Sequence, residues 1–342
     1  MHVRRAENLR RYNSLALAGH ATALVEAGSD EEVRLACRWA REREMAVIPL
    51  GEGSNVVIAG ELNAMVLRQR TRGIRLLEDD GNGVLLRVGA GENWHAFAQW
   101  TLQQGLVGLE NLALIPGTVG AAPIQNIGAY GVELAPFVQA VQALRIEDGE
   151  AMTLSRRECA FGYRDSVFKR ELRDAVVITA VDLRLERTPS LNTEYPALAA
   201  ALAGHDVSAL TPQDVFEAVV NIRRARLPDP AVEPNAGSFF KNPVIEAEQA
   251  GALAVRFPDI PLYPQTGGRF KTSAAWLIDY CGWKGRRRGQ VGVHPGHALV
   301  LVNYGSGSGT ELLSLAAEIA GSVEKAFAVS LEIEPRIYRQ AA

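Results

Sequence analysis

The chain has 342 residues and a formal net charge of −3 at pH 7, from 36 Lys and Arg against 39 Asp and Glu. That balance argues against a general nucleic-acid-binding protein. No apolar run approaches the roughly 20 residues that span a bilayer, so no membrane insertion is expected. Three distant cysteines and the lack of a secretory signal after Met1 predict reduced thiols in a cytoplasmic protein.

The length exceeds what one core usually organises, so two or three domains are expected. Residues 1–70 have the pattern of a small α/β unit. A cap at Ser29 precedes apolar residues at helical spacing over 33–40, and a short apolar strand is predicted at 45–50.

Residues 71–210 are expected to be richer in strands. Apolar and β-branched runs predict strands over 84–88 and 175–185. A helix is predicted over 92–104, where Gly105 would end it.

Residues 211–342 are expected to form a third domain. A helix begins at Pro212, an apolar strand follows at 298–302, and a long helix covers 310–327. The chain is predicted to end in a strand over 329–338. Because helices and strands alternate along the chain, the fold class is mixed α/β.

Two glycine-rich segments suggest a cofactor. Residues 51–55 follow a predicted strand, and their glycines allow backbone N–H groups to face a diphosphate. Residues 114–131 hold four glycines and almost no charge, which suits close approach to a flat cofactor, with Gln125 and Asn126 at its polar edge. A hairpin-like connection and a buried structural loop are the alternatives for the two segments.

A third segment, residues 235–243, places Ser238 after a glycine and before Phe239 and Phe240. A short hydroxyl in such a loop can approach a reacting carbon away from bulk water. A tight turn over an apolar anchor is the alternative interpretation.

The chain resembles the UDP-N-acetylenolpyruvoylglucosamine reductase family. The motifs that carry this resemblance occur in family order over nearly the whole chain: 51–55, 116–120, 125–131, 161–168, 227–230, 235–243 and 331–336. Residues 186–210, with Tyr195, resemble the substrate-covering loop of the family's type I form.

The resemblance implies a vanillyl-alcohol-oxidase type FAD-binding fold of two subdomains, 1–70 and 71–210, and a C-terminal substrate-binding domain over 211–342. It implies non-covalent FAD held between the first two domains, NADPH as reductant, and UDP-N-acetylglucosamine enolpyruvate as acceptor. The implied product is UDP-N-acetylmuramate, a peptidoglycan precursor. Flavin N5 would deliver hydride to C3 of the enolpyruvyl group, and an acid would protonate C2.

Three residues are candidates for this chemistry. Arg164 suits the substrate carboxylate, because a guanidinium is always charged and binds carboxylates bidentately. Glu334, protonated, would hydrogen-bond the enolate, and Ser238 matches the family's C2 proton donor. A structural salt bridge of Arg164 with Asp165 or another acid, and a solvated strand face for Glu334, are the alternatives.

The resemblance also implies two binding sets. Cofactor contacts are expected from Gly51, Glu52, Gly53, Ser54, Asn55, Pro116, Gly117, Thr118, Gly120, Ala121, Gln125, Asn126, Gly128, Ala129, Tyr130 and Gly131. Substrate contacts are expected from Tyr195, Arg226, Lys241, Asn242 and His297. The family often has Lys at the Arg226 position and Gln at the His297 position. No metal site is expected.

Two other functions are compatible with the sequence. Another flavoprotein of the same fold would oxidise a lactone or an alcohol, but it would lack the combination of Arg164, Ser238 and Glu334. A nucleotide-sugar-binding module that kept the fold would be colourless even with added FAD. The basic residues 284–288 are expected to form a solvated loop, with phosphate binding as the alternative.

Overall fold

The computed structural model describes residues 1–188, 190–206 and 209–339. The chain forms two compact units. The first comprises 1–7, 21–53 and 62–225, and the second comprises 8–20, 54–61 and 226–342. The division into three sequence domains stays a prediction. Residues 189, 207–208 and 340–342, which fall within the predicted covering loop and the last domain, lie outside the described residues.

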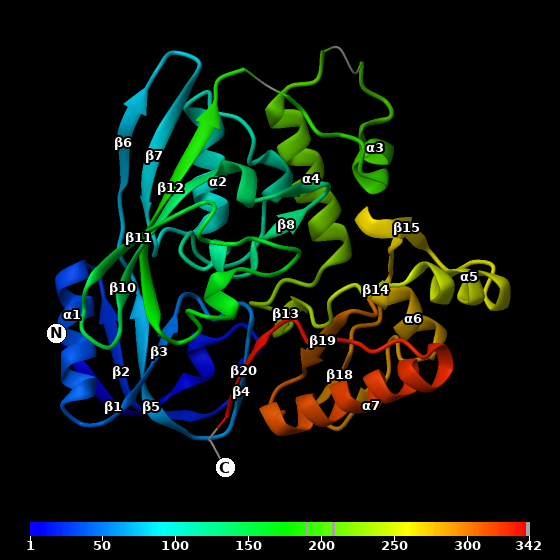
Figure 1. Ribbon diagram of the computed structural model, residues 1–342. Helices are drawn as coiled ribbons and strands as arrows, with labels where there is room; N and C mark the ends of the chain where they lie inside the picture. The colour runs from blue at the N-terminus through cyan, green and yellow to red at the C-terminus, as the bar shows by residue number, and fades with distance from the viewer. Residues whose placement is uncertain (189, 207–208, 340–342) are drawn as a thin grey trace. The chain divides into compact units, whose positions relative to one another are not determined.

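One sheet of the first unit has four strands. Strand β5 runs parallel to both β2 and β3, and helix α1 contacts β3 and β5 (Figure 1). The predicted cap is confirmed, because the Ser29 hydroxyl accepts the Glu32 N–H at 3.2 Å. The elements, in sheet order and then the helix, are β1 (Val3–Asn8), β2 (His20–Ala27), β5 (Leu62–Gln69), β3 (Ala46–Leu50) and α1 (Asp30–Arg41).

The other large sheet of the first unit has five antiparallel strands. Buried residues of its strands share one core with residues of three helices, among them Trp94 and Phe97. The strands in sheet order are β11 (Ala151–Ser155), β10 (Val138–Arg145), β12 (Val176–Glu186), β7 (Gly83–Gly89) and β6 (Ile74–Asp79). The helices are α2 (Trp94–Gln103), α3 (Pro196–Leu202) and α4 (Pro212–Arg226), and a small hairpin pairs β8 (Gly128–Ala129) with β9 (Val132–Glu133).

The second unit combines small sheets with three helices. Its four-stranded sheet has the order β13 (Asn235–Ser238), β19 (Val300–Asn303), β18 (Val291–Val293) and β17 (Arg287–Arg288). A three-stranded sheet has the order β14 (Val244–Ile245), β16 (Phe270–Thr272) and β15 (Leu262–Pro264). The helices are α5 (Ala247–Arg256), α6 (Ala274–Tyr280) and α7 (Gly309–Phe327), and β4 (Val56–Ala59) pairs in parallel with β20 (Arg336–Arg339).

The predicted final strand is shorter than expected. The prediction covered 329–338, but only β20, Arg336–Arg339, is a strand. Pro335 has no N–H to donate, so a continuous ladder cannot pass through it. The residues before Pro335 instead make a local antiparallel pairing around Ile333, which is described below.

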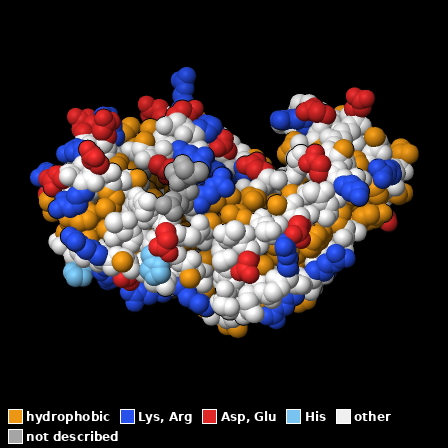
Figure 2. All heavy atoms as spheres, turned by 90° about the horizontal axis from the view of Figure 1, so that it is seen from below, with side chains coloured by type: hydrophobic (Ala, Val, Ile, Leu, Met, Phe, Trp, Pro, Cys, Tyr) orange, Lys and Arg blue, Asp and Glu red, His pale blue; other side chains and the backbone are white. Residues whose placement is uncertain are grey.

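Charged side chains of both signs are mixed over the face that Figure 2 shows, in keeping with the small net charge. Among the described residues, no helix is both long enough and apolar enough to cross a membrane.

Candidate active site

Residues 51–53 of the first predicted cofactor loop lie beside the second predicted loop, and both belong to the first unit. A Cβ built on Gly51 would stand 2.7 Å from the Thr118 hydroxyl oxygen. A Cβ on Gly120 would stand 2.4 Å from the Cβ of Ala90. A side chain at Gly120 would clash with Ala90, and one at Gly51 would force the Thr118 side chain to move, so glycine permits close packing at both positions.

Both loops present backbone donors. In the described part of the chain, the N–H groups of Gly51, Glu52, Gly53 and Thr118 donate to no protein acceptor. Gly53 has a φ of +68°, so the backbone turns in a conformation that glycine adopts without strain. Gly53 and Thr118 are buried, and buried N–H groups require acceptors such as the oxygens of an anionic diphosphate. The residues present thus fit FAD.

Asn126 has a structural task within this region. Its carboxamide nitrogen donates to the Glu133 carboxylate at 2.8 Å and to the Gly162 carbonyl at 3.0 Å, and its oxygen accepts the Ala135 N–H at 2.9 Å. The side chain is buried, and both of its donors are engaged. Any contribution of Asn126 to a cofactor site is therefore through its backbone or through the shape of the loop.

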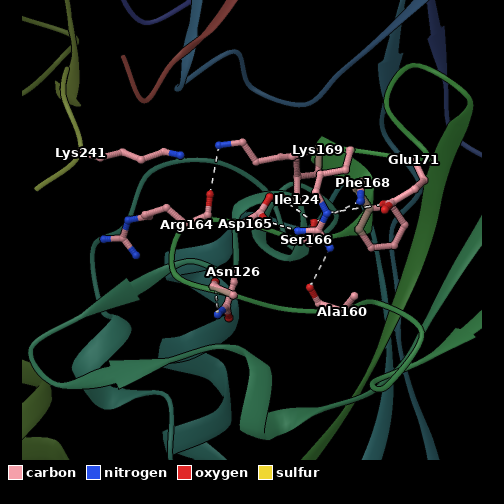
Figure 3. A network of polar contacts seen from close by, with 12 residues as sticks. Ile124, Asn126, Ala160, Arg164, Asp165, Ser166, Phe168, Lys169, Glu171 and Lys241 are labelled. Atoms are coloured by element: carbon pink, nitrogen blue, oxygen red, sulfur yellow. Dashed lines mark hydrogen bonds and ion pairs between the residues drawn. The ribbon is translucent and has the colours of Figure 1, made fainter. Parts of the chain in front are cut away.

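The turn that carries Arg164 is fixed by its neighbours. Gly162 and Asp165 exchange backbone hydrogen bonds, and the Ser166 hydroxyl donates to the Ile124 carbonyl at 2.6 Å. Figure 3 shows the Arg164 guanidinium extending away from Ser166. The backbone carbonyl of Arg164 accepts a hydrogen bond from the Lys169 ammonium at 3.1 Å. Arg164 has a φ of +53°, a left-handed backbone conformation that is uncommon for a non-glycine residue.

The Arg164 guanidinium donates to the Gly128 carbonyl at 2.7 Å, at the edge of the second glycine-rich loop. The neighbouring Asp165 forms its ion pair with Arg170 instead. The Asp165–Arg170 ion pair therefore does not support the alternative hypothesis of a salt bridge between Asp165 and Arg164.

A second arginine of the same unit, Arg223, was not among the expected site residues. Its Nε donates to the Leu114 carbonyl at 3.2 Å, and the Tyr130 phenol lies near its guanidinium. Burial, and then the nearby positive charge of Arg164, lower the pKa of Arg223, while Tyr130 acts in the opposite direction. Among the described residues, no acidic side chain forms an ion pair with Arg223.

A half-buried guanidinium with neutral partners favours an anionic ligand nearby. The one sequence signal for Arg223 was its place in the run of arginines before Leu227, and that run did not distinguish it from Arg224 or Arg226.

Tyr195 lies at the start of α3, and its ring meets the Tyr130 ring edge-on, with centroids 5.3 Å apart. The Tyr195 side chain is exposed, so a ligand can reach it. Tyr195, Tyr130 and Arg223 thus form one connected group in the first unit.

In the second unit, Ser238 ends β13 beside a bulge at Gly237, whose φ is +68°. Asn235 is buried and holds this loop: its oxygen accepts the Gly237 N–H at 2.8 Å and its nitrogen donates to the Pro228 carbonyl at 3.1 Å. Phe239 and Phe240 beyond it are fully buried, so the aromatic anchor is present. Ser238 itself is half-buried.

The segment before Pro335 pairs with the Ser238 loop. The Glu334 N–H donates to the Phe239 carbonyl and the Lys241 N–H donates to the Glu332 carbonyl, each at 2.9 Å. An antiparallel bridge joins Phe240 to Ile333 between them. The structure therefore brings the backbone of Glu334 next to the residue that follows Ser238.

Lys241 and Asn242 follow the aromatic pair. The Lys241 ammonium forms an ion pair with Glu332 at 2.5 Å. The Asn242 oxygen accepts the Ala274 N–H at 3.0 Å at the start of α6, which leaves the amide nitrogen as a donor.

His297 has a defined hydrogen-bonding state. Its Nδ1 accepts the Leu299 N–H at 3.2 Å, so the neutral ring carries its proton on Nε2 and donates there. Burial, followed by His294, Arg226 and Lys284, lowers the pKa of His297. A neutral Nε2–H offers the same kind of donor as the glutamine amide common in the family.

The basic residues 284–288 contact other protein groups. Lys284 pairs with Asp279 at 3.2 Å, Arg288 pairs with Glu318, and Arg287 lies over the Tyr304 ring. These contacts favour the solvated surface over a phosphate site.

The sequence-predicted residues fall into two groups. Arg164, Tyr195, residues 51–53 and the loop 116–131 belong to the first unit. Ser54, Asn55, Ser238, Glu334 and the other substrate candidates (Arg226, Lys241, Asn242 and His297) belong to the second.

Family sequence profiles match both parts of the chain. The FAD binding domain profile matches residues 21–155, and the profile of the UDP-N-acetylenolpyruvoylglucosamine reductase C-terminal domain matches residues 229–338. Together they cover more than half of the chain.

Relatives named UDP-N-acetylenolpyruvoylglucosamine reductase match almost end to end. The protein of Pseudomonas aeruginosa is 46% identical over 331 residues, which cover 97% of each chain. That of Burkholderia pseudomallei is 48% identical over 330 residues, which cover 96% of this chain and 95% of the relative.

Two solved structures resemble this one. The UDP-N-acetylenolpyruvylglucosamine reductase of Thermus caldophilus has a TM-score of 0.68 at 25% identity and covers 99% of this chain and 100% of its own. A VAO-type flavoprotein of Myceliophthora thermophila has a TM-score of 0.50 at 13% identity, covering 94% of this chain and 73% of its own, which bears on the fold alone.

The FAD-binding profile and the relatives named reductases define an FAD-dependent oxidoreductase, and its fold is of the vanillyl-alcohol-oxidase type, as the sequence predicted. Within that class, the chain belongs to the UDP-N-acetylenolpyruvoylglucosamine reductase family.

Proposed function

We propose that this enzyme uses NADPH and bound FAD to reduce UDP-N-acetylglucosamine enolpyruvate to UDP-N-acetylmuramate, in peptidoglycan precursor synthesis in the cytoplasm. Family membership supports the reaction type. The observation that carries the proposal is the pairing of the Ser238 loop with the Glu334 segment, through the Glu334 N–H to the Phe239 carbonyl at 2.9 Å. This pairing holds a hydroxyl donor and a carboxyl group in one small region of the second unit.

When bound, FAD carries a hydride from NADPH to C3 of the substrate. Residues of the chain stabilise the negative charge that develops on the substrate and supply the proton for C2. Negative charge that develops at C2 spreads into the substrate carboxylate, and Arg164 binds that carboxylate. Ser238 Oγ gives its proton to C2, which saturates the double bond, and solvent returns a proton to the serine. A serine hydroxyl is a weak acid, so it serves only toward a strongly basic enolate at short range.

Other residues hold the ligands. The backbone N–H groups of residues 51–53 and 118 bind FAD, as does the neighbouring loop backbone. Arg226, Lys241 and the amide nitrogen of Asn242 bind the UDP diphosphate, together with the neutral Nε2–H of His297. Tyr195 contacts the same phosphates, and Arg223 stabilises anionic charge in the first unit.

The test separates two half-reactions in anaerobic absorbance. NADPH should bleach the flavin of Ser238→Ala at the normal rate, whereas reoxidation by the enolpyruvyl sugar should slow by about two orders of magnitude or more, as general acids typically contribute. Ser330→Ala is a matched control, because Ser330 is exposed and its hydroxyl donates to the Glu324 carboxylate, away from the Ser238 loop, and both of its rates should stay normal.

Unchanged reoxidation in Ser238→Ala would remove this serine from the proton-donor role. A yellow wild-type protein whose reduced flavin the sugar fails to reoxidise would contradict the proposed reaction. In that case another flavin-dependent oxidation becomes the better hypothesis.

A further inference from the structure

A buried asparagine joins the exposed Tyr195 segment to the second cofactor loop. Asn111 lies in a 3₁₀ turn, Glu110–Leu112, and only 1% of it is exposed. Its carboxamide nitrogen donates to the Tyr130 carbonyl at 2.9 Å and to the Asn192 carbonyl at 2.8 Å. Both N–H groups of one side chain are therefore used to hold two loops together.

Other contacts near the two Asn111 hydrogen bonds also join the segment 192–195 to residues 130–131. The Asn192 side chain donates back to the Gly131 carbonyl at 3.3 Å. Three residues further on, the Tyr195 ring meets the Tyr130 ring edge-on at 5.3 Å. The position of Tyr195 is fixed on its other side by α3, whose Leu198 is fully buried.

Tyr195 is exposed and lies at the end of an irregular segment, so its placement depends on such tethers. A segment that is not held in its bound position must be ordered when ligand binds, and that cost weakens affinity. The catalytic hydroxyl and the NADPH reaction do not require this tether.

We propose that Asn111 is a positioning residue that holds segment 192–195 against the loop 128–131 and thereby places Tyr195 for the UDP-sugar. The inference rests on the proposed function, in which Tyr195 contacts the substrate diphosphate. The Asn111 side chain acts through backbone carbonyls, so its effect does not depend on which residue stands at position 192.

The decisive variant is Asn111→Ala. We expect the KM for the enolpyruvyl sugar to rise about tenfold, since two hydrogen bonds that order the segment are lost. The kcat should stay within about threefold, and the rate of flavin reduction by NADPH within about twofold, because neither step requires the segment to be ordered by this bond.

Two further variants separate positioning from general damage. Glu110→Gln changes a buried neighbour in the same turn, keeps an acceptor for the Gly108 N–H (2.7 Å), and should leave the KM within about twofold. On a Tyr195→Ala background, Asn111→Ala should raise the KM by less than about twofold, because its effect runs through Tyr195.

The outcomes are distinct. An unchanged KM in FAD-loaded Asn111→Ala, or a full tenfold effect on the Tyr195→Ala background, overturns the positioning role alone. A wild-type protein without sugar-dependent NADPH oxidation overturns the proposed function. If Asn111→Ala does not retain FAD, Asn111→Ser keeps one donor and should raise the KM about threefold, and an unchanged KM there overturns the role equally.

Discussion

Adding a single methyl group at Gly120 tests whether the close contact between the cofactor loop and the strand-to-helix connection is required. A Cβ at this position would stand 2.4 Å from the Cβ and 2.9 Å from the Cα of Ala90, whereas ordinary contacts begin at 3.4 Å. The loop would have to retreat by about 1 Å, although the Gly120 N–H is bonded to the Ala90 carbonyl at 2.9 Å. Ala90 belongs to the buried core, so it has little room to yield.

Overpacking of this kind costs about 1–3 kcal/mol in the free energy of unfolding. A loss of about 2 kcal/mol lowers the melting temperature of a domain of this size by about 4–8 °C. FAD affinity should fall about tenfold or more, because the same displacement moves the loop's backbone donors. Thermal unfolding and flavin-fluorescence titration measure the two effects. Gly204→Ala is the control, since nothing lies within 4 Å of a Cβ there. A change below about 1 °C with unaltered FAD affinity would refute the close-approach argument.

Two further predictions concern charge. Arg223→Met should slow flavin reoxidation by the sugar about tenfold or more while FAD stays bound, because a charge-assisted contact is lost. Arg223→Lys should recover part of the rate, and equal rates in Arg223→Met and wild type would contradict the anion-binding role. His297 has a lowered pKa, so the unfolded chain takes up its proton first as the pH falls below about 6.5, and folding stability is lost in that direction. His297→Gln should therefore lose less stability than wild type between about pH 7.5 and about pH 5.5 in urea unfolding, and an equal loss would contradict the assignment.

The class, the family and the elements with strong local signals could all be predicted from the amino-acid sequence alone. The cap at Ser29, the long strand β12 (predicted 175–185, observed Val176–Glu186) and helix α7 all follow from residues close together in the chain. Local patterns of this kind depend on backbone propensity and apolar periodicity, which neighbouring residues set. The final strand was predicted too long because its apolar alternation passes through Pro335, whose missing N–H ends the ladder.

Which polar groups contact one another became known only from the folded chain. Asn111 bonds carbonyls 19 and 81 residues away, and Lys241 pairs with Glu332 across 91 residues. The structure also showed that the Asn126 carboxamide, expected at the cofactor, bonds protein partners, and that Arg223 is half-buried whereas Arg224 and Arg226 are exposed. Burial and hydrogen-bond satisfaction depend on contacts between distant segments, so one-dimensional patterns do not reveal them.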